Sequence, residues 1–212
     1  MKQTTIFNTH TAAYEAWYNK YPQVYLSEFE AIKEQFQKLP ENIKGVEIGL
    51  GTGRFSQLLG IKEGVEPSEE MAALAAKKGI EVIQGTAEHI PYKDLSFDFV
   101  LFVTICHLSN FKEALIESHR ILKPKGSIVI GFIDKDQTIG KAYEAKRKDS
   151  VFFKNAVFYS VSLVTRMLKE AGFKNLVFNQ TLFGELDEIS QVQLPKSGFG
   201  EGSFVVVKAD KK

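Results

Sequence analysis

The stretch Val46-Glu-Ile-Gly-Leu-Gly-Thr-Gly-Arg-Phe55 decides the fold of this 212-residue chain. It continues an apolar segment, places three glycines at alternate positions (Gly49, Gly51 and Gly53), and leads into a short segment with helical character. This pattern is typical of a strand that turns sharply into the first turn of a helix, where glycines let the backbone approach a ligand closely. It therefore predicts a ligand-binding turn at the carboxyl end of a strand.

Two acidic residues accompany the turn. Glu47 lies inside the strand end, where a carboxylate is costly unless it meets a donor. Glu66 lies 19 positions further on, close to the offset of about 20 residues at which an acid meets ribose hydroxyls in dinucleotide folds. Both acids also have structural alternatives, since Glu47 could be an ion-pair partner and Glu66 the first acid of a helix that begins near Ser68.

The spacing of the glycines distinguishes between two classes of ligand. A pyrophosphate-binding turn requires G-x-G-x-x-G, because its third glycine packs the helix against the strand while helix amides face phosphate. This chain has G-x-G-x-G, an acid just upstream, and no Lys-Ser/Thr pair of a phosphate loop. A carboxylate near the turn repels phosphate but suits a ligand that carries an ammonium group.

The segment Glu47-x-Gly49-x-Gly51-x-Gly53 resembles motif I of class I S-adenosylmethionine-dependent methyltransferases, in their small-molecule, quinone-biosynthesis-like branch (methyltransferase type 11). Four further segments match this family in order. Residues 64–71 are similar to the motif whose acid holds the ribose hydroxyls, 85–91 to the adenine pocket, 96–107 to the fourth strand and the loop beside the methyl group, and 120–126 to the turn before the fifth strand. Five ordered matches over nearly the whole chain make the resemblance specific.

The resemblance implies S-adenosylmethionine as the cofactor and a set of cofactor contacts. These are Glu47, Gly49, Leu50, Gly51, Gly53, Glu66, Pro67, Met71, Thr86, Ala87, Glu88 and Thr104. One position departs from the family pattern, because an aspartate that accepts from the adenine amino group often precedes Ala87, and here it is Thr86. The adenine contact then falls to the threonine hydroxyl, to backbone groups or to Glu88.

Apolar and helical segments alternate along the chain. Strands are expected near 44–49, 62–66, 80–84, 97–104, 126–133, 176–183 and 203–209, and helices near 53–60, 68–78, 110–123 and 158–171. Alternation of this kind implies right-handed βαβ units and a parallel sheet covered on both sides. The expected fold is a single α/β domain over residues 1–212, with a Rossmann-like, seven-stranded, mostly parallel sheet and helices on both faces. The resemblance adds an antiparallel C-terminal strand pair.

Two segments are additional to this core. In residues 1–38, four aromatic residues recur at helical spacing, and Pro22 ends this pattern. The pattern indicates an amphipathic helix before Pro22. This helix either packs on the domain or caps the cofactor pocket, and the resemblance favours a cap in which Trp17 and Tyr18 face the substrate. Residues 134–159 form an insertion that either extends the core or acts as a lid. The resemblance implies that this insertion shapes the acceptor pocket.

The reaction that the resemblance implies is an in-line displacement at an activated methyl group, so the protein has to align the reactants and exclude water. An aromatic pocket suits the dispersal of charge, and Phe132 and Phe158, two of the 17 phenylalanines, are candidate substrate contacts. His107 follows the fourth expected strand and is the candidate base, since its ordinary pKa of about 6.5 suits proton removal. The alternative is a loop histidine that binds backbone or cofactor. No histidine pair has metal-ligand spacing with Cys106, so no metal is expected.

The charge and composition of the chain limit the classes of partner that are expected. The net charge of +1 gives no field that favours nucleic acid or an anionic membrane, and an Asn/Asp-Pro-Pro-aromatic motif for base methylation is missing after the fourth strand. One cysteine, no signal-peptide pattern and no apolar window of about 18 residues are consistent with a cytoplasmic protein. The expected partner is a small-molecule acceptor with an O, N or C nucleophile, and the expected state is a monomer or homodimer.

Two other functions stay open. A methyltransferase-like protein could bind the nucleoside without catalysis, which the sequence separates poorly from an enzyme. An NAD(P)-dependent oxidoreductase is the other alternative, and the missing third glycine at the proper spacing argues against it.

Overall fold

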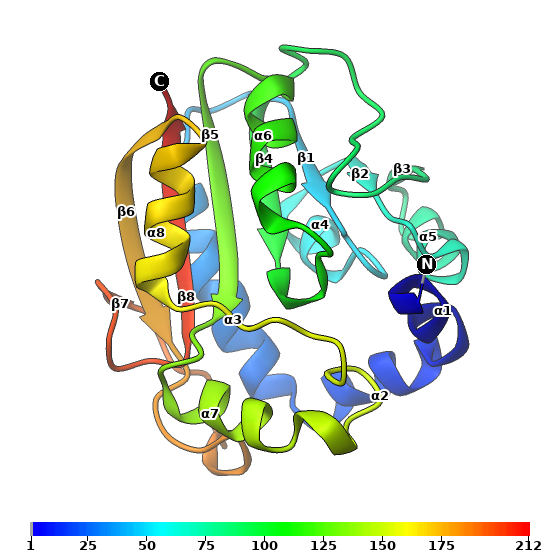
Figure 1. The fold of residues 1–212 in the computed structure, drawn as a ribbon, viewed down its shortest axis with the longest axis vertical. Helices are drawn as coiled ribbons and strands as arrows, with labels where there is room; N and C mark the ends of the chain where they lie inside the picture. The colour runs from blue at the N-terminus through cyan, green and yellow to red at the C-terminus, as the bar shows by residue number, and fades with distance from the viewer. Residues whose placement is uncertain (1) are drawn as a thin grey trace.

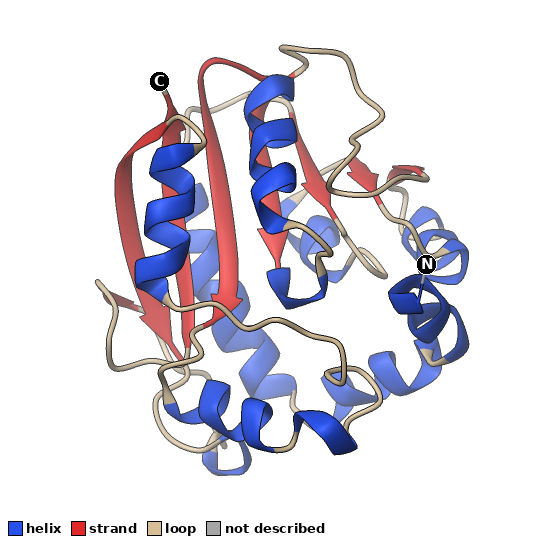
Figure 2. Cartoon of the chain, viewed as in Figure 1, coloured by secondary structure: helices blue, strands red, loops and turns tan. Residues whose placement is uncertain are grey.

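A single mixed sheet runs through the centre of the protein (Figures 1 and 2). The computed structural model describes residues 2–212, with side chains from residue 4, so the first residue of the expected cap lies outside the described part. The strands are β1 (Gly45–Ile48), β2 (Glu63–Val65), β3 (Glu81–Ile83), β4 (Phe97–Val103), β5 (Leu122–Ile133), β6 (Phe173–Thr181), β7 (Lys196–Ser197) and β8 (Phe204–Lys211). Their spatial order is β3-β2-β1-β4-β5-β8-β6-β7.

Helices cover both faces of the sheet and its ligand-binding edge. They are α1 (Lys2–Thr9), α2 (Thr11–Lys20), α3 (Pro22–Phe36), α4 (Arg54–Leu59), α5 (Glu69–Ala76), α6 (Phe111–Ile121), α7 (Thr138–Ala145) and α8 (Val161–Glu170), with short 3₁₀ turns η1 (Ile105–His107), η2 (Arg147–Asp149) and η3 (Leu186–Glu188). In Figure 1, α6 and α8 lie in front of the sheet and α3 behind it, while α2 and α7 lie below the carboxyl ends of the central strands.

The strand pairing confirms an α/β, Rossmann-like fold. Strands β1 to β5 pair in parallel, and β8 runs antiparallel between β5 and β6. The predicted number of seven strands is wrong, because the sheet of the described chain has eight. The extra strand, β7, has two residues that pair with Asn179 and Gln180 of β6, and two residues are too few to show a period of two in a sequence.

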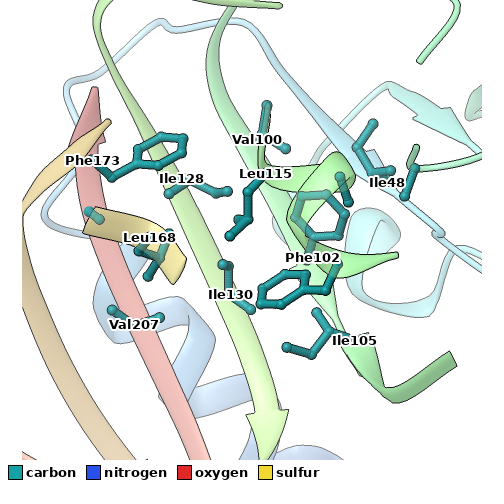
Figure 3. Close-up of a cluster of buried hydrophobic side chains, with 14 of the residues drawn as sticks. Ile48, Val100, Phe102, Ile105, Leu115, Ile128, Ile130, Leu168, Phe173 and Val207 are labelled. Atoms are coloured by element: carbon teal, nitrogen blue, oxygen red, sulfur yellow. The ribbon is translucent and has the colours of Figure 1, made fainter. Parts of the chain in front are cut away.

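The continuous apolar runs arise because two hydrophobic layers share each central strand. Val100 and Phe102 of β4 point into the cluster under α6 and α8, which Figure 3 shows together with Ile128 and Leu168. Leu101, between them, points into the cluster under α3 on the opposite face. Successive side chains of a strand alternate between faces, so a strand that is covered on both sides has to be apolar at every position.

Local signals in the sequence set the ends of several helices. Ser68, Asn110 and Ser160 cap α5, α6 and α8, and each side-chain oxygen accepts a hydrogen bond from a first-turn amide. Such caps satisfy amides that have no partner inside the helix. Pro22 is the first residue of α3, a position where proline loses no hydrogen bond and its fixed φ suits the helix. The chain therefore bends at Tyr21 and α2 leaves the line of α3.

The packing of α6 gives a direct test of the core. Leu115 is fully buried and its neighbour Ile116 is 47% exposed. We expect Leu115→Ala to lower the free energy of unfolding by about 2–5 kcal/mol, because it leaves a cavity between α6 and the sheet. The matched Ile116→Ala should cost less than about 1 kcal/mol. Denaturant unfolding of both variants checks this, and equal losses would contradict the assigned face of α6.

Candidate functional site

The site is a cavity of about 540 Å³ at the carboxyl ends of the parallel strands. One end lies against the glycine turn after β1 and the loops after β2 and β3, and the other end lies against the aromatic side chains of α2, α7 and the 146–160 segment. In open α/β sheets, ligands bind outside this edge. The cavity therefore lies where the sequence places the ligand.

The backbone of the glycine turn is shaped for close approach. Gly49 and Gly51 both line the cavity, with φ of +69° and +57°. A Cβ added to Gly49 would meet no atom within 4 Å, and one added to Gly51 would lie 3.1 Å from the Tyr14 hydroxyl oxygen. Both residues have left-handed φ values, which side chains disfavour. The turn thus leaves room that a ligand can fill.

Glu66 is the acid that the loop after β2 presents to the cavity. It is buried, and its two carboxylate oxygens accept hydrogen bonds from the Gly51 amide at 2.8 Å and from the Ser68 amide at 2.9 Å. Burial raises the pKa of Glu66 to about 6, although both amides oppose the shift. Each oxygen retains a free lone pair, so the carboxylate can still accept from hydroxyl groups of a ligand.

Three of the predicted cofactor residues lie behind the turn and do not line the cavity. Glu47 is buried, accepts a hydrogen bond from the Ser56 hydroxyl, and has its pKa raised to about 8 by burial. Leu50 packs with residues of the α5 side of the sheet, and Gly53 leaves no room for a side chain against Ile80. These contacts hold α4 and α5 against the strands, and a direct contact of the three residues with cofactor stays a prediction.

The other predicted cofactor residues line the cavity. They are Gly49, Gly51, Glu66, Pro67, Met71, Thr86, Ala87, Glu88 and Thr104. Glu88 is already engaged, because it accepts hydrogen bonds from the Asn110 amide and the Ser109 hydroxyl. Burial works against ionisation of Glu88, but these hydrogen bonds lower its pKa overall. Thr104 has φ of +62° at the end of β4, an unusual backbone for a β-branched residue that often marks a functional position.

Helices α1 and α2 are fastened to the glycine turn. Glu15 of α2 forms an ion pair with Arg54 and accepts a hydrogen bond from the Thr52 hydroxyl at 2.5 Å. The Asn8 side chain of α1 accepts from the Ser68 hydroxyl at 2.6 Å. The contacts of Glu15 and Asn8 therefore join this segment to the glycine turn, to the start of α4 and to the loop that holds Glu66.

All four predicted substrate residues line the cavity: Trp17, Tyr18, Phe132 and Phe158. They come from α2, β5 and the segment before α8. Tyr18 donates to or accepts from the Tyr14 hydroxyl at 2.9 Å, and the Arg54 guanidinium lies over its ring at 4.6 Å. The aromatic end offers ring faces and few polar groups.

His107 lies in the wall between the two ends. Its ring stacks on Phe153 with centroids 5.7 Å apart and meets the ring of Phe7 edge-on at 5.0 Å. Its Nδ1 is buried without a hydrogen-bond partner among the described residues. Burial lowers the pKa of His107 to about 4, so the ring is neutral at pH 7. It can accept or donate one hydrogen bond, but it holds an added proton weakly.

The structure adds lining residues that the sequence reasoning did not select as site residues. Glu28 of α3, Tyr143 of α7 and Leu182 after β6 all line the aromatic end. Leu182 has φ of +63°, which no sequence pattern announces. Glu28 did carry a signal, because it falls at helical spacing between the buried Val24 and Ile32, and an acid on an apolar helix face is unusual.

The cavity fits the cofactor that motif I implies and shows no feature of a metal centre. The open space over Gly49, the free lone pairs of Glu66 and the apolar wall near Ala87 suit the amino-acid, ribose and adenine parts of S-adenosylmethionine. Within residues 2–212, no group of three His, Cys, Asp or Glu side chains is arranged to hold a metal ion. Burial raises the pKa of Cys106 to about 12, so this thiol stays protonated. No helix in the described chain is long and apolar enough to cross a membrane.

Comparisons with known proteins identify the family of the chain. The methyltransferase domain family matches residues 46–130, which contain the glycine turn and Glu66. A crystal structure from Thermotoga maritima, described as an S-adenosylmethionine-dependent methyltransferase and possible histamine N-methyltransferase, is 44% identical to this chain. It superimposes with a TM-score of 0.94 over 99% of this chain and 100% of that one.

Two relatives found by sequence also bear on the family and its branch. An uncharacterized protein of Methanocaldococcus jannaschii is 44% identical over 207 residues, which are 97% of this chain and 98% of the relative. A demethylmenaquinone methyltransferase of Lactobacillus johnsonii is 27% identical in a 150-position alignment that covers 57% of this chain and 61% of that protein, so the quinone-biosynthesis branch has only weak support. Fold, site and relatives together show that the chain belongs to the class I S-adenosylmethionine-dependent methyltransferases.

Proposed function

We propose that this methyltransferase methylates a small molecule that enters the aromatic end of the cavity. The observation that carries the proposal is the division of one cavity into two chemically different ends. Gly49, Gly51 and Glu66 form a polar cradle at one end, and Trp17 and Phe158 belong to an aromatic wall at the other. A volume of about 540 Å³ falls in the range of about 300–1,000 Å³ that is usual for small-molecule sites.

The charge of the protein supports a small acceptor over a nucleic acid. The chain has 27 basic and 26 acidic residues, and a nucleic-acid site requires a basic surface that neutralises phosphates. Arg54, a cation beside the cavity, is paired with Glu15. Residues 1–38 and 134–159 supply much of the aromatic wall, and we assign them as the cap and the lid of the single domain.

The bound cofactor supplies an activated methyl group, and the protein supplies alignment. Gly49, Gly51 and Glu66 would hold the cofactor, whose sulfur is the leaving group, and the aromatic wall would orient the acceptor atom, which would lose its proton to water. Alignment of reactants can lower such a barrier by about 7–11 kcal/mol. Aromatic walls suit this step when a neutral nucleophile attacks, because the positive charge disperses as the bond forms.

His107 is proposed to contact the acceptor or the reacting methyl group. Its Nδ1 is a buried polar atom without a protein partner, and a ligand group that supplies a hydrogen bond there removes the cost of that burial. A pKa of about 4 makes the ring a better hydrogen-bond acceptor than a proton store at neutral pH. Orientation of the acceptor is therefore the role that its environment supports best.

The relatives suggest the class of acceptor. The Thermotoga maritima protein is described as a possible histamine N-methyltransferase, whereas the more distant Lactobacillus johnsonii enzyme acts on demethylmenaquinone by its name. The first is 44% identical over the whole chain, and the second 27% identical over 57% of it. A small amine is therefore the acceptor class that the relatives favour.

Two measurements test the proposed function. Calorimetry with S-adenosylhomocysteine tests the cofactor site, and incubation with methyl-labelled S-adenosylmethionine and a library of small amines and phenols tests transfer. We expect saturable binding and labelled product. Binding without label on any compound would favour a non-catalytic binding protein, and saturable binding of a reduced nicotinamide without S-adenosylhomocysteine binding would favour an oxidoreductase.

Gly51→Val tests the cradle. A side chain here adopts φ of +57° and places its Cβ 3.1 Å from the Tyr14 hydroxyl oxygen, in space that faces the ligand. We expect S-adenosylhomocysteine binding to be lost in calorimetry. Gly79→Val is the matched control, because Gly79 has φ of +80° with no atom within 4 Å of the added Cβ. The control should lose about 1–2 kcal/mol of stability and bind normally. Normal affinity in folded Gly51→Val would show that the turn is purely structural.

Glu66→Gln tests the ribose contact. Its ionised carboxylate accepts hydroxyls better than its protonated form, and burial raises the pKa of Glu66 to about 6. Wild-type affinity for S-adenosylhomocysteine should therefore rise as the pH increases from 5 to 7 and then level off. The variant should bind about 10- to 100-fold more weakly with a flatter profile, and exposed Glu70→Gln should match the wild type. A variant that melts early but binds normally would mean that Glu66 only holds the loop.

A further inference from the structure

Glu28 is a buried acid without a partner. It lies on α3, is 8% exposed, and lines the aromatic end of the cavity. Among the described residues, none donates a hydrogen bond to its carboxyl group or forms an ion pair with it. Buried acids are nearly always paired or hydrogen-bonded, because an unpaired one is costly. The position therefore requires an explanation that the protein's own contacts do not give.

Two of the phenols near Glu28 are engaged elsewhere. Tyr18 shares a hydrogen bond with Tyr14, and the Tyr25 hydroxyl donates to the Arg54 carbonyl oxygen at 3.1 Å. The Arg54 guanidinium forms its ion pair with Glu15. The negative charge of Glu28 acts on Tyr18 and Tyr25 and contributes to their raised pKa values. It thus faces phenols that do not neutralise it.

Tyr143 of α7 completes this part of the cavity. It lines the same end, and the charge of Glu28 contributes to its raised pKa after burial, the main cause. No hydrogen bond of the Tyr143 hydroxyl to another described residue is present. A carboxyl and a phenol from two separate elements therefore border one apolar space, and both are open to a ligand. The ring faces of Trp17 and Phe158 border that space as well.

Glu28 and Glu66 reach the cavity from different elements of the fold. Helix α3 packs on β5, β6 and β8, and Leu182, which follows β6, borders the same end of the cavity. Glu66 follows β2, and β1, β4, β5 and β8 lie between β2 and β6 in the sheet. Glu28 and Glu66 therefore reach the cavity from different parts of the sheet, so separate groups of the bound molecules can contact them.

We propose that Glu28 anchors the methyl acceptor, and that the acceptor carries a basic amine whose N–H groups pair with this carboxylate between aromatic walls. The proposal rests on the proposed function and names the substrate class and its recognition residue. An ammonium group supplies the missing partner of Glu28, and aromatic faces around a cation add cation–π attraction. A neutral quinone or phenol would supply no cation to pair with the carboxylate of Glu28.

Ionisation of Glu28 provides a signature of this pairing. Burial raises the pKa of Glu28 to about 8 in the free protein, so at pH 7 the group is mostly protonated. Pairing with an ammonium stabilises the carboxylate, lowers that pKa and releases a proton. The phenols that face it, Tyr18, Tyr25 and Tyr143, have pKa values above their ordinary one and stay protonated at pH 7. Proton release on binding would therefore report on Glu28.

The experiment compares amines with neutral analogues on the full chain saturated with S-adenosylhomocysteine. The probes are 2-phenylethylamine, histamine and tryptamine, each paired with the alcohol that replaces its terminal amine, and calorimetry is run at pH 7 in two buffers of different ionisation enthalpy. We expect at least one amine to bind more tightly than its alcohol and to release a proton. Glu28→Gln should weaken that amine about 10- to 100-fold, abolish proton release, and leave the alcohol unchanged.

Matched variants separate the possible outcomes. Glu30→Gln removes an acid of the same helix that is paired with Lys33, and it should bind the amine like the wild type. Glu28→Asp keeps the charge and should retain part of the preference for the amine. Unchanged S-adenosylhomocysteine binding by Glu28→Gln shows that the variant is folded and that the cofactor site is intact. Equal amine binding by wild type and Glu28→Gln, or no preference of the wild type for any amine, overturns the proposal. If the wild type itself does not bind S-adenosylhomocysteine, the proposed function is rejected instead.

Discussion

The fold and the site both depend on the carboxylate of Glu66. It joins the turn after β1 to the loop after β2 by accepting from the amides of Gly51 and Ser68. Two loops that belong to different βα units are thereby held at one fixed separation at the edge of the sheet. Since a carboxylate has about four acceptor positions, the same group can hold the two loops and still receive a ligand. The geometry of the cofactor end follows from this one side chain.

Much of the cofactor end could be predicted from sequence because its residues are close in the chain. The glycine turn and Glu66 are local patterns on adjacent βα units, and the loops of such units meet at one edge of a parallel sheet. The sequence could not show that Gly49 and Gly51 line the cavity whereas Glu47 does not, since the burial of Glu47 behind the turn depends on how α4 packs. Ser56, the partner of Glu47, lies on that helix. The glycine pattern and the short distance along the chain therefore identified the turn, but they did not show which residues of the turn face the cavity.

The acceptor end was less predictable because distant segments assemble it. Residues from α3, α7 and the loop after β6 meet there. Helix α3 lies more than a hundred residues from the other two segments, and no short-range pattern encodes such contacts. The aromatic residues of α2 were visible as a helical stripe, and the structure brings Trp17 and Tyr18 to the cavity. Glu28 was not selected because an acid in a helix usually faces solvent, although its helical spacing between Val24 and Ile32 was a signal. Local strain at Leu182 had no signal at all.

The attachment of α2 to the glycine turn has a consequence for the motion of α2. Glu15 holds Arg54 and Thr52, and the Tyr14 hydroxyl lies over Gly51. Any motion of α2 away from the glycine turn therefore has to break the Glu15–Arg54 ion pair. Because dissolved electrolyte weakens the attraction between partly exposed charges, such a motion becomes easier as the ionic strength rises.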